Sequence, residues 1–546
     1  MSDDEKREPS INAAESKTPC MRGRFMRGNR ETPESPSTDG GEGRSEKATG
    51  RTSDTHDPGE SDGPIVPRKR ANKAGRPAAE SVEGSGSTKG NVSQAAAYRT
   101  QSRASVSIGL AGVREAARRD QDVRFTALLH HITPALLEAS FYELKRSASP
   151  GVDGVTWRAY ADGLTDRIAD LHGRVHRGAY RAKPSKRAWI SKPDGRQRPL
   201  GIAALEDKIV QQATKTVLDQ IYEEDFLGFS YGFRPGRGAH DALDAWSVGL
   251  ERRKVNWVLD ADIRGFFDTI DHGWLLRFLE HRIADHRVLR LIRKWLRAGV
   301  SEDGTWSKTE VGTAQGAVIS PLLANVYLHY VFDLWVDQWR RRHARGDVIV
   351  VRYADDVVMG FQHRSEAERF LHELRARFEQ FGLSLHPEKT RLIEFGRFAA
   401  ERRNRRGAGR PETFDFLGFT HYGGRTRKGD FAIKRKSASK RLRATLRAIK
   451  VQLQRRMHAP VAEQGQWLRR VMQGWYNYHA VPGNGRCLSQ FRTAVGRLWQ
   501  HVLRRRSQKA RPSLWKWVAR LIQRWFPATR ILHPYPNERF AVMHPR

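Results

Sequence analysis

The spacing of apolar and polar residues divides the chain into an unpatterned beginning and a patterned remainder. Residues 1 to about 95 are rich in Gly, Pro, Ser, Thr, Glu and Arg and contain one aromatic residue, Phe25. Such a segment cannot bury enough apolar surface to offset the entropy lost on ordering, so we expect a disordered arm over residues 1–95. Apolar residues at helical spacing begin near residue 110 and predict two helices before residue 150.

Helical patterns then alternate with short β-prone runs. Residues on both sides of Pro193-Asp194-Gly195 favour strands and predict a hairpin. A helical pattern with basic faces covers 437–530. The whole order predicts an α/β (α+β) core followed by an α-helical region. The remaining expected elements are helices at 205–222 and 364–382, and strands at 257–263, 311–314, 348–353, 357–361 and 414–420.

Charge changes this picture by indicating a partner. The chain has 97 Lys+Arg against 61 Asp+Glu, a formal net charge of +36. Residues 431–546 carry 26 basic residues and only two acidic ones, Glu463 and Glu538, interleaved with tryptophans. A solvated basic face is the alternative, but a concentration of this size favours a polyanionic partner, because neutralising phosphates releases condensed counterions.

Hydropathy and cysteine content exclude several classes of protein. No stretch approaches the ~20 apolar residues of a membrane helix, and the acidic, polar N-terminus lacks the apolar core of a secretory signal. The two cysteines, Cys20 and Cys487, exclude a disulfide framework and a Cys-rich zinc site. We therefore expect a cytoplasmic, nucleoid-associated protein with no membrane partner.

Three aspartates are the candidates for chemistry. Asp355 and Asp356 stand side by side between two β-prone runs, and Asp262 ends another apolar run. Carboxylates on neighbouring strand ends would hold two Mg²⁺ about 3.5–4 Å apart, the geometry for in-line phosphoryl transfer. The Asp-Asp pair alone is also compatible with an ordinary turn, so the surrounding motifs decide its meaning.

Eight motifs occur in a fixed order. They are SPGVDGVT (149–156), ISKPDGRQRPLGI (190–202), YGFRPGRGAHDAL (231–243), DADIRGFFDTIDH (260–272), GTAQGAVISPLLANVYLHY (312–330), RYADDVV (352–358), LSLHPEKT (383–390) and FDFLGF (414–419). Together they resemble the reverse transcriptases encoded by bacterial group II introns, also called intron maturases, over roughly residues 110–480. The resemblance implies a right-hand polymerase, with an N-terminal extension and fingers at 110–255, a palm at 256–425, a thumb or maturase domain at 431–500, and a basic nucleic-acid-binding tail at 501–546.

The resemblance implies roles for the matched positions of the catalytic part. Asp262, Asp355 and Asp356 would be the catalytic carboxylates and, together with Ile263, would bind two Mg²⁺ ions. Lys192 and Arg198 would grip the incoming triphosphate, and Gln315 would contact the nucleotide or the templating base. Phe267 would be the gate against a ribose 2′-hydroxyl. Phe266 is the alternative gate. The alternative role for the phenylalanine named as the gate is a buried position in the core.

The thumb part carries the RNA-binding candidates. Residues 473–481, QGWYNYHAV, match the signature of the maturase domain. Trp475, Tyr476 and Tyr478 are candidates to stack on unpaired bases. The alternative for Trp475 and Tyr478 is the core between the thumb helices, and we favour this core position for Trp475. Arg469, Arg470, Arg504, Arg505 and Arg506 are expected to contact phosphates of RNA or DNA.

The activity implied is RNA-templated addition of dNMP to a primer 3′-end. A second implied activity is binding of a group II intron RNA to promote its splicing and mobility. Partners would be the intron RNA, an RNA template with a DNA primer, dNTPs, target DNA, and a host nuclease or replication machinery that supplies primers. The alternatives are a splicing cofactor with a vestigial polymerase site, or a retron, diversity-generating or CRISPR-linked reverse transcriptase. Phe267 and the Tyr-Ala-Asp-Asp motif disfavour an RNA-templated RNA polymerase.

Overall fold

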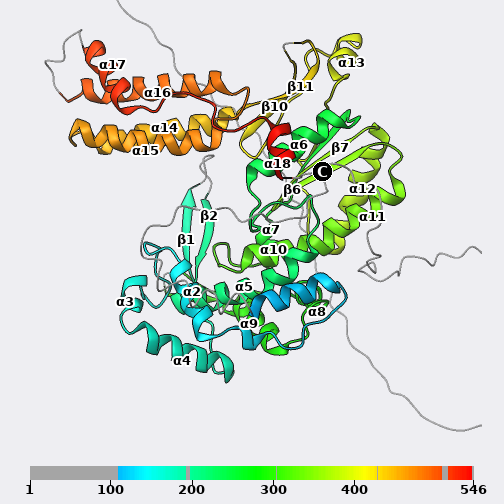
Figure 1. The fold of residues 1–546 in the computed structure, drawn as a ribbon, viewed down its shortest axis with the longest axis vertical. Coiled ribbons are helices and arrows are strands. Elements are labelled where there is room, and N and C mark those ends of the chain that lie inside the picture. The colour runs from blue at the N-terminus through cyan, green and yellow to red at the C-terminus, as the bar shows by residue number, and fades with distance from the viewer. Residues whose placement is uncertain (1–108, 192–196, 303, 427, 507–513, 544–546) are drawn as a thin grey trace, which may run out of the picture. The chain divides into compact units, whose positions relative to one another are not determined.

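The computed structural model describes residues 109–191, 197–302, 304–426, 428–506 and 514–543 (Figure 1). The disordered arm predicted over 1–95 and the turn Pro193-Asp194-Gly195 lie outside these ranges. Within them, a mixed α/β region is followed by a helical region, as the residue pattern predicts. None of the described helices has the length and apolar character needed to span a membrane.

Helices occupy the first part of the described chain, and a small sheet follows them. Helix α2 (Pro134–Glu143) begins with Pro at its first turn, and the Thr133 hydroxyl accepts a hydrogen bond from Leu136 N at 3.2 Å. Strands β1 (Ser185–Ser191) and β2 (Gln197–Ile202) pair antiparallel on both sides of the predicted turn, which confirms the flanks of the hairpin. The other elements are η1 (Leu129–His131), α3 (Trp157–Ala161), α4 (Leu164–His176), β4 (Val300–Glu302) and β5 (Thr305–Ser307), and the sheet order is β2-β1-β4-β5.

A second sheet, with strand order β6-β7-β3-β8, is buried on both faces. Its strands are β3 (Trp257–Asp262), β6 (Val348–Tyr353), β7 (Asp356–Phe361) and β8 (Arg391–Glu394), and all neighbours are antiparallel. Val348 and Val350 join a core cluster that includes α12 (Arg364–Gln380). Ile349 and Val351 point the other way, into a cluster with α6 (Ala239–Arg252). Because side chains alternate along a strand, this near-continuous apolar run fits burial on two sides.

The helices around this sheet complete the α/β region. Helix α5 (Leu205–Asp225) confirms the helix predicted at 205–222, and α12 confirms the one predicted at 364–382. The other elements are α7 (Phe266–Thr269), α8 (His272–Glu280), α9 (His286–Arg297), α10 (Ser320–Leu328), the π-helix η2 (His329–Asp333), α11 (Leu334–His343) and α13 (Ala399–Arg405).

Two predicted strands differ from the structure. Residues 311–314 form a loop, because Gly312 has φ 88° and its backbone lies against Phe267, where a strand could not continue. The run predicted at 414–420 is broken by Leu417 and Gly418, both at positive φ. It forms two strands, β9 (Phe414–Phe416) and β10 (Phe419–Arg425), which join β11 (Phe431–Ser437) in the order β11-β10-β9.

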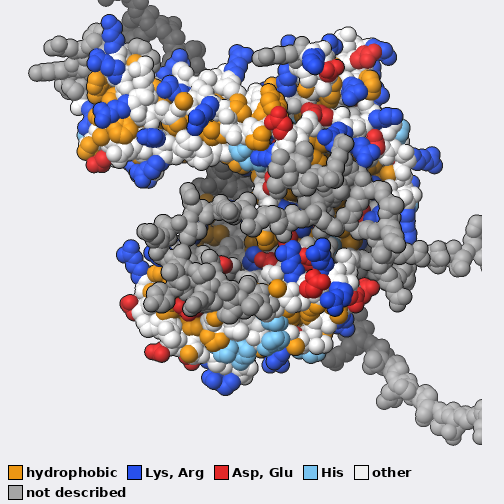
Figure 2. Space-filling model, viewed as in Figure 1, with side chains coloured by type: hydrophobic (Ala, Val, Ile, Leu, Met, Phe, Trp, Pro, Cys, Tyr) orange, Lys and Arg blue, Asp and Glu red, His pale blue; other side chains and the backbone are white. Residues whose placement is uncertain are grey.

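The helical pattern over 437–530 resolves into α14 (Ser439–Arg455), α15 (Val461–His479), α16 (Gly485–Arg504) and α17 (Leu514–Trp525). Their apolar stripes form a core cluster of their own, in which Trp499 is fully buried. Figure 2 shows Lys and Arg side chains spread over the visible surface of this region, where Asp and Glu are sparse.

The segment predicted as a separate basic tail, 501–546, is part of the fold where it is described. Helix α17 packs on α15 and α16, and α18 (Pro536–Met543) packs on α6. Phe540 is 7% exposed within the cluster around α6, and Arg539 Nε donates to Asp244 Oδ2 at 2.6 Å. Phe540 thus supplies an apolar anchor within a segment whose basic charge predicts nucleic-acid binding, and that binding role stays a prediction.

Candidate active site

Strand pairing brings the three candidate aspartates to one end of the second sheet. Asp262 is the last residue of β3, and it stands directly opposite Asp356, the first residue of β7. Asp355 belongs to the turn between β6 and β7, which Ala354 closes with φ 56°. Residues opposite each other on antiparallel strands project from the same face, so Asp262 and Asp356 share a face. The sheet therefore assembles carboxylates that are 94 residues apart in sequence.

This end of the sheet is unfavourable for negative charge. Desolvation, and then the neighbouring carboxylates of Asp355, Asp262 and Asp260, raise the pKa of Asp356 to about 7. Desolvation also raises the pKa of Asp355, with Arg198 and Lys389 acting in the opposite direction. The Asp356 side chain still reaches solvent, so its desolvation is incomplete and the repulsion between carboxylates matters. A bound cation would remove that repulsion, and oxygen ligands are those that Mg²⁺ prefers.

A lysine forms an ion pair with one of the three aspartates. Lys389 Nζ donates to Asp262 Oδ2 at 2.7 Å, and it is held there because His386 N donates to Asp262 O at 2.8 Å. In the described part of the chain, no three Asp, Glu, His or Cys side chains converge closely enough to hold a metal as they stand. The side chain of Ile263 is buried and apolar, so only its carbonyl oxygen could be a ligand. The donor set fits Mg²⁺ if Asp262 turns from the ammonium towards the ion.

A buried arginine holds the turn that carries Asp355. The guanidinium of Arg352 is fully buried and donates to both carboxylate oxygens of Asp333, at 2.7 and 2.5 Å. It also donates to Asn325 Oδ1 at 3.0 Å, to Ser230 Oγ at 2.7 Å and to the carbonyl of Ala354 at 3.1 Å. One side chain thus fixes Ala354, the left-handed residue of the turn that carries Asp355, to two other segments. Arg352 and Lys389 both lie within motifs of the sequence, but their type and spacing predict neither of these roles.

The candidate nucleotide contacts come together on the first sheet. Arg198 Nε donates to Gln315 Oε1 at 2.6 Å, and Gly201 N donates to the carbonyl of Gln315 at 2.7 Å. The loop that carries Gln315 is therefore fixed to β2, although 117 residues separate Arg198 from Gln315. Lys192, the second predicted triphosphate contact, lies outside the described residues.

Burial distinguishes the two phenylalanines considered as the gate. Phe266 is 3% exposed and belongs to the main core cluster, whereas Phe267 is only half-buried at the edge of that cluster. The carbonyl of Phe267 accepts a hydrogen bond from Thr313 N at 2.7 Å, which joins it to the loop of Gln315. Of the two, Phe267 is the residue whose ring can meet a substrate.

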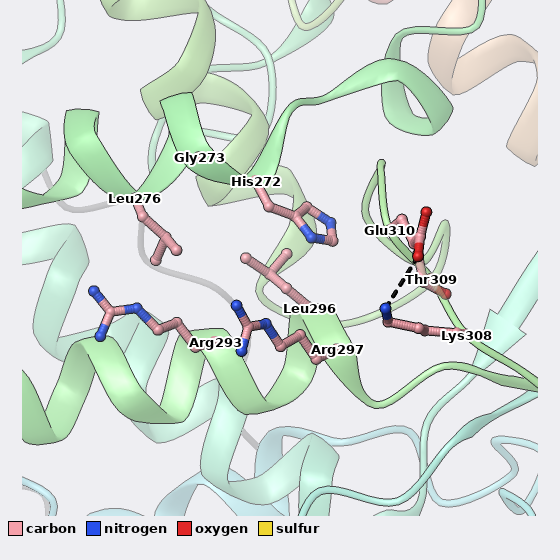
Figure 3. Close-up of a pocket in the computed structure, with 9 residues that line it drawn as sticks. All are labelled: His272, Gly273, Leu276, Arg293, Leu296, Arg297, Lys308, Thr309 and Glu310. Carbon is pink, nitrogen blue, oxygen red and sulfur yellow. Dashed lines mark hydrogen bonds and ion pairs between the residues drawn. The ribbon is translucent and has the colours of Figure 1, made fainter. Parts of the chain in front are cut away.

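A pocket of about 480 Å³ lies away from the aspartates, between α8, α9 and residues 308–310 (Figure 3). Its single carboxylate, that of Glu310, is 3.0 Å from Lys308 Nζ. His272 lines the pocket and donates from Nε2 to the carbonyl of Gly312 at 2.6 Å, so the pocket borders the loop that leads to Gln315. With one paired carboxylate it offers no two-metal site.

The predicted RNA contacts divide by burial. Arg469 and Arg470 are exposed on α15, and Arg504, Arg505 and Arg506 are exposed at the end of α16. The prediction that Tyr476 stacks on bases is wrong for this structure, because the ring is 1% exposed inside the helical core. Tyr478 is half-buried beside Phe419, and its hydroxyl donates to the carbonyl of Leu417 at 2.6 Å, so it serves packing as well. The predicted core position of Trp475 is confirmed.

Comparison with known proteins supports one family. The family model described as reverse transcriptase (RNA-dependent DNA polymerase) matches residues 190–421. Protein YkfC of Escherichia coli (strain K12) is 33% identical over 312 residues, which cover 50% of this chain and 81% of YkfC. The group II intron-encoded protein LtrA of Lactococcus lactis subsp. cremoris is 35% identical over 227 residues, covering 41% of this chain but only 37% of LtrA. A 91 kDa protein in the cob intron of Schizosaccharomyces pombe is 42% identical over 146 residues, covering 27% of this chain and 18% of that protein.

Proposed function

Because the chain belongs to the reverse transcriptase family and is related to group II intron-encoded proteins, we propose that it adds dNMP to a primer 3′-end on an RNA template at Asp262, Asp355 and Asp356. The observation that carries this proposal is the direct pairing of Asp262 with Asp356 across two strands, with Asp355 at the adjoining turn. Carboxylates held together in this way, with raised pKa values for Asp355 and Asp356, favour a site for divalent cations over an ordinary turn.

Each residue of the proposed site has a task that its position suits. Two Mg²⁺ ions, when bound, would activate the attacking 3′-oxygen and stabilise the departing pyrophosphate. The three aspartates would hold the two ions in place. Until the Asp262 carboxylate turns towards the ions, the Lys389 ammonium neutralises it. The exposed Arg198 binds the triphosphate, and its bond to Gln315 aligns that residue with the nucleotide. Phe267 lies under the sugar and clashes with a 2′-hydroxyl.

Primer extension on an RNA template tests the proposal. The isosteric variant Asp355→Asn/Asp356→Asn should lose on the order of a thousandfold in rate, since a bound metal supplies several kcal/mol of transition-state stabilisation. The matched control is Asp166→Asn, an exposed aspartate in the first turn of α4, which should extend normally. Equal circular dichroism and melting temperatures would show that all proteins are folded. Normal cDNA yield from the double variant would overturn the proposal.

We further propose that the chain binds a group II intron RNA and promotes its splicing and mobility. The exposed arginines of α15 and α16 support this, as does the likeness to the group II intron-encoded protein LtrA. Target DNA, and primers from a host nuclease or from replication, belong to the same proposal. Splicing needs no protein carboxylate, so Asp355→Asn/Asp356→Asn should splice the cognate intron at low Mg²⁺ as well as the wild type does. If splicing persists while the wild type makes no cDNA, the polymerase site is vestigial.

A further inference from the structure

Phe233 combines an unfavourable backbone with an exposed aromatic ring. It lies in the loop between α5 and α6, with φ 60° and a side chain that is 51% exposed. In the described part of the chain, only Ala354 and Leu417 share positive φ among residues other than glycine. A bulky residue in the left-handed region is strained, and such strain persists only where the surroundings impose it. Glycine or asparagine would fit this backbone at lower cost.

The residue before Phe233 is pressed against the catalytic turn. A Cβ added to Gly232 would lie 2.2 Å from the backbone nitrogen of Ala354, so only glycine allows this approach. Asn325 Nδ2 donates to the carbonyl of Gly232 at 2.7 Å, and Tyr231 N donates to the carbonyl of Arg352 at 2.8 Å. The loop is thereby fixed to the same turn that carries Asp355.

The residue after Phe233 is fixed as firmly. Arg234 is 6% exposed, and its guanidinium donates to both carboxylate oxygens of Glu223 and to the carbonyls of Leu227 and Ser230. Rigid anchors on both sides leave Phe233 no freedom to relax its φ. The exposed ring gains little from the fold, so folding alone does not explain a phenylalanine here.

Resting on the proposed function, we infer that Phe233 is a further substrate-contacting residue, whose ring packs on the last base pair of the primer–template duplex. The growing 3′-end has to reach the carboxylates, and Phe233 stands on the segment that abuts their turn. The candidate contacts of the incoming nucleotide, Arg198 and Gln315, are fixed instead to β2. Aromatic rings stack on bases of any sequence, which suits an enzyme that copies every template.

The substitution Phe233→Gly separates the ring from the strain. It should raise the melting temperature, because glycine adopts this φ without cost, yet weaken binding of a labelled RNA–DNA primer–template hybrid by about tenfold, the loss of one stacked base. The KM for the hybrid should rise by a similar factor, and the KM for dNTP should not change. Phe233→Trp keeps a ring and should bind like the wild type. The matched control is Phe398→Ala, another exposed phenylalanine, at 48%, which should change neither binding nor KM.

Three results would overturn the inference. Unchanged hybrid binding by Phe233→Gly would show that the ring contacts no substrate. A rise confined to the KM for dNTP would place the ring at the nucleotide instead of the duplex. A lower melting temperature for Phe233→Gly would show that the ring stabilises the fold. Hybrid binding needs no catalysis, so a wild type that binds but makes no cDNA would contradict the proposed function while leaving this contact testable.

Discussion

The sheet region (205–437) and the C-terminal helices (439–526) differ in where they place their charged side chains. Between residues 205 and 437 charged groups are buried, among them Arg352, Asp333, Asp244 and Arg435. Between residues 439 and 526, no described Lys, Arg, Asp or Glu is buried, and the interior around Trp499 is built of aromatic and aliphatic side chains with a few uncharged polar ones such as Gln464. Some arginines are therefore buried structural ties in the first region, whereas no described arginine is buried in the second. The proposed active site lies in the region whose charged groups are buried.

The largest difference in unfolding free energy between the two regions should come from replacing a buried arginine. Arg352→Met leaves Asp333 buried without its cation, and breaking such a pair costs about 3–5 kcal/mol of unfolding free energy. The exposed Arg470→Met on α15 should stay within about 0.5 kcal/mol of the wild type. Urea unfolding of the purified proteins measures both.

The double substitution Arg352→Met/Asp333→Leu controls for that comparison. It removes both charges and should recover much of the stability, since the cost comes from the uncompensated carboxylate. Its primer-extension rate should nevertheless remain low, because the Ala354 carbonyl has lost its donor. Equal stability of Arg352→Met and wild type would contradict the structural role given to this arginine.

Acid should weaken the sheet region through a buried histidine. Burial, and then Arg435, lower the pKa of His421 to about 3, whereas an unfolded chain has the ordinary value near 6.5. The folded state holds this ring neutral, so its stability is complete above pH 6.5 and falls as the pH drops below it. We expect the loss from this residue to steepen towards about 1.4 kcal/mol per pH unit as the pH falls from 6.5 to 5. Chemical denaturation at several pH values measures the slope.

His421→Phe provides the matched variant for this pH dependence. His421 stacks on Phe414 with ring centroids 5.1 Å apart, a contact that a phenylalanine can keep. The slope of unfolding free energy against pH between pH 6.5 and 5 should become shallower by the contribution of about one bound proton. An unchanged slope would mean that other groups, such as His240 with its pKa lowered to about 3, carry the whole effect.

The smallest effect on stability should accompany a clear effect on binding. Arg469→Gln/Arg470→Gln removes two exposed cations from α15 and should change the unfolding free energy by less than about 0.5 kcal/mol. If both meet phosphates of single-stranded RNA, the slope of log affinity against log salt should fall in magnitude by about 1.4. Arg375→Gln, an exposed arginine on α12, is the control. An unchanged salt slope for the double variant would remove these residues from the RNA surface.

Residue patterns predicted the fold where local signals and burial agree. Strands such as β6 are apolar on both faces, so their pattern is unambiguous, and α5 has a long helical period. The loop at 311–314 was read as a strand because Val311 and its neighbours favour one locally. The close approach of Gly312 to Phe267 that prevents it joins distant segments. The local sequence does not predict the position of α18 for the same reason, because its contact with α6 also joins distant segments.

The candidate site followed a similar division. The aspartates were found because their types and motifs are informative, and the strand register then placed Asp262 opposite Asp356. The roles of Arg352 and Lys389 depend on partners 19 and 127 residues away, which spacing alone does not reveal. The prediction for Tyr476 is wrong because an aromatic residue in a basic helix can face solvent or the core, and only the packing shows which.

The packing of α18 on α6 also bears on the order in which the chain folds. Asp244 is joined to Arg435 and to Arg539, which follow it by 191 and 295 residues. Contacts of such sequence separation close large loops and form slowly. During synthesis from the N-terminus, the surface of α6 around Asp244 stays uncovered until α18 has emerged, about 295 residues later. The sheet region is thus completed by a distant helix, and we expect a slow folding phase that disappears when α18 is deleted.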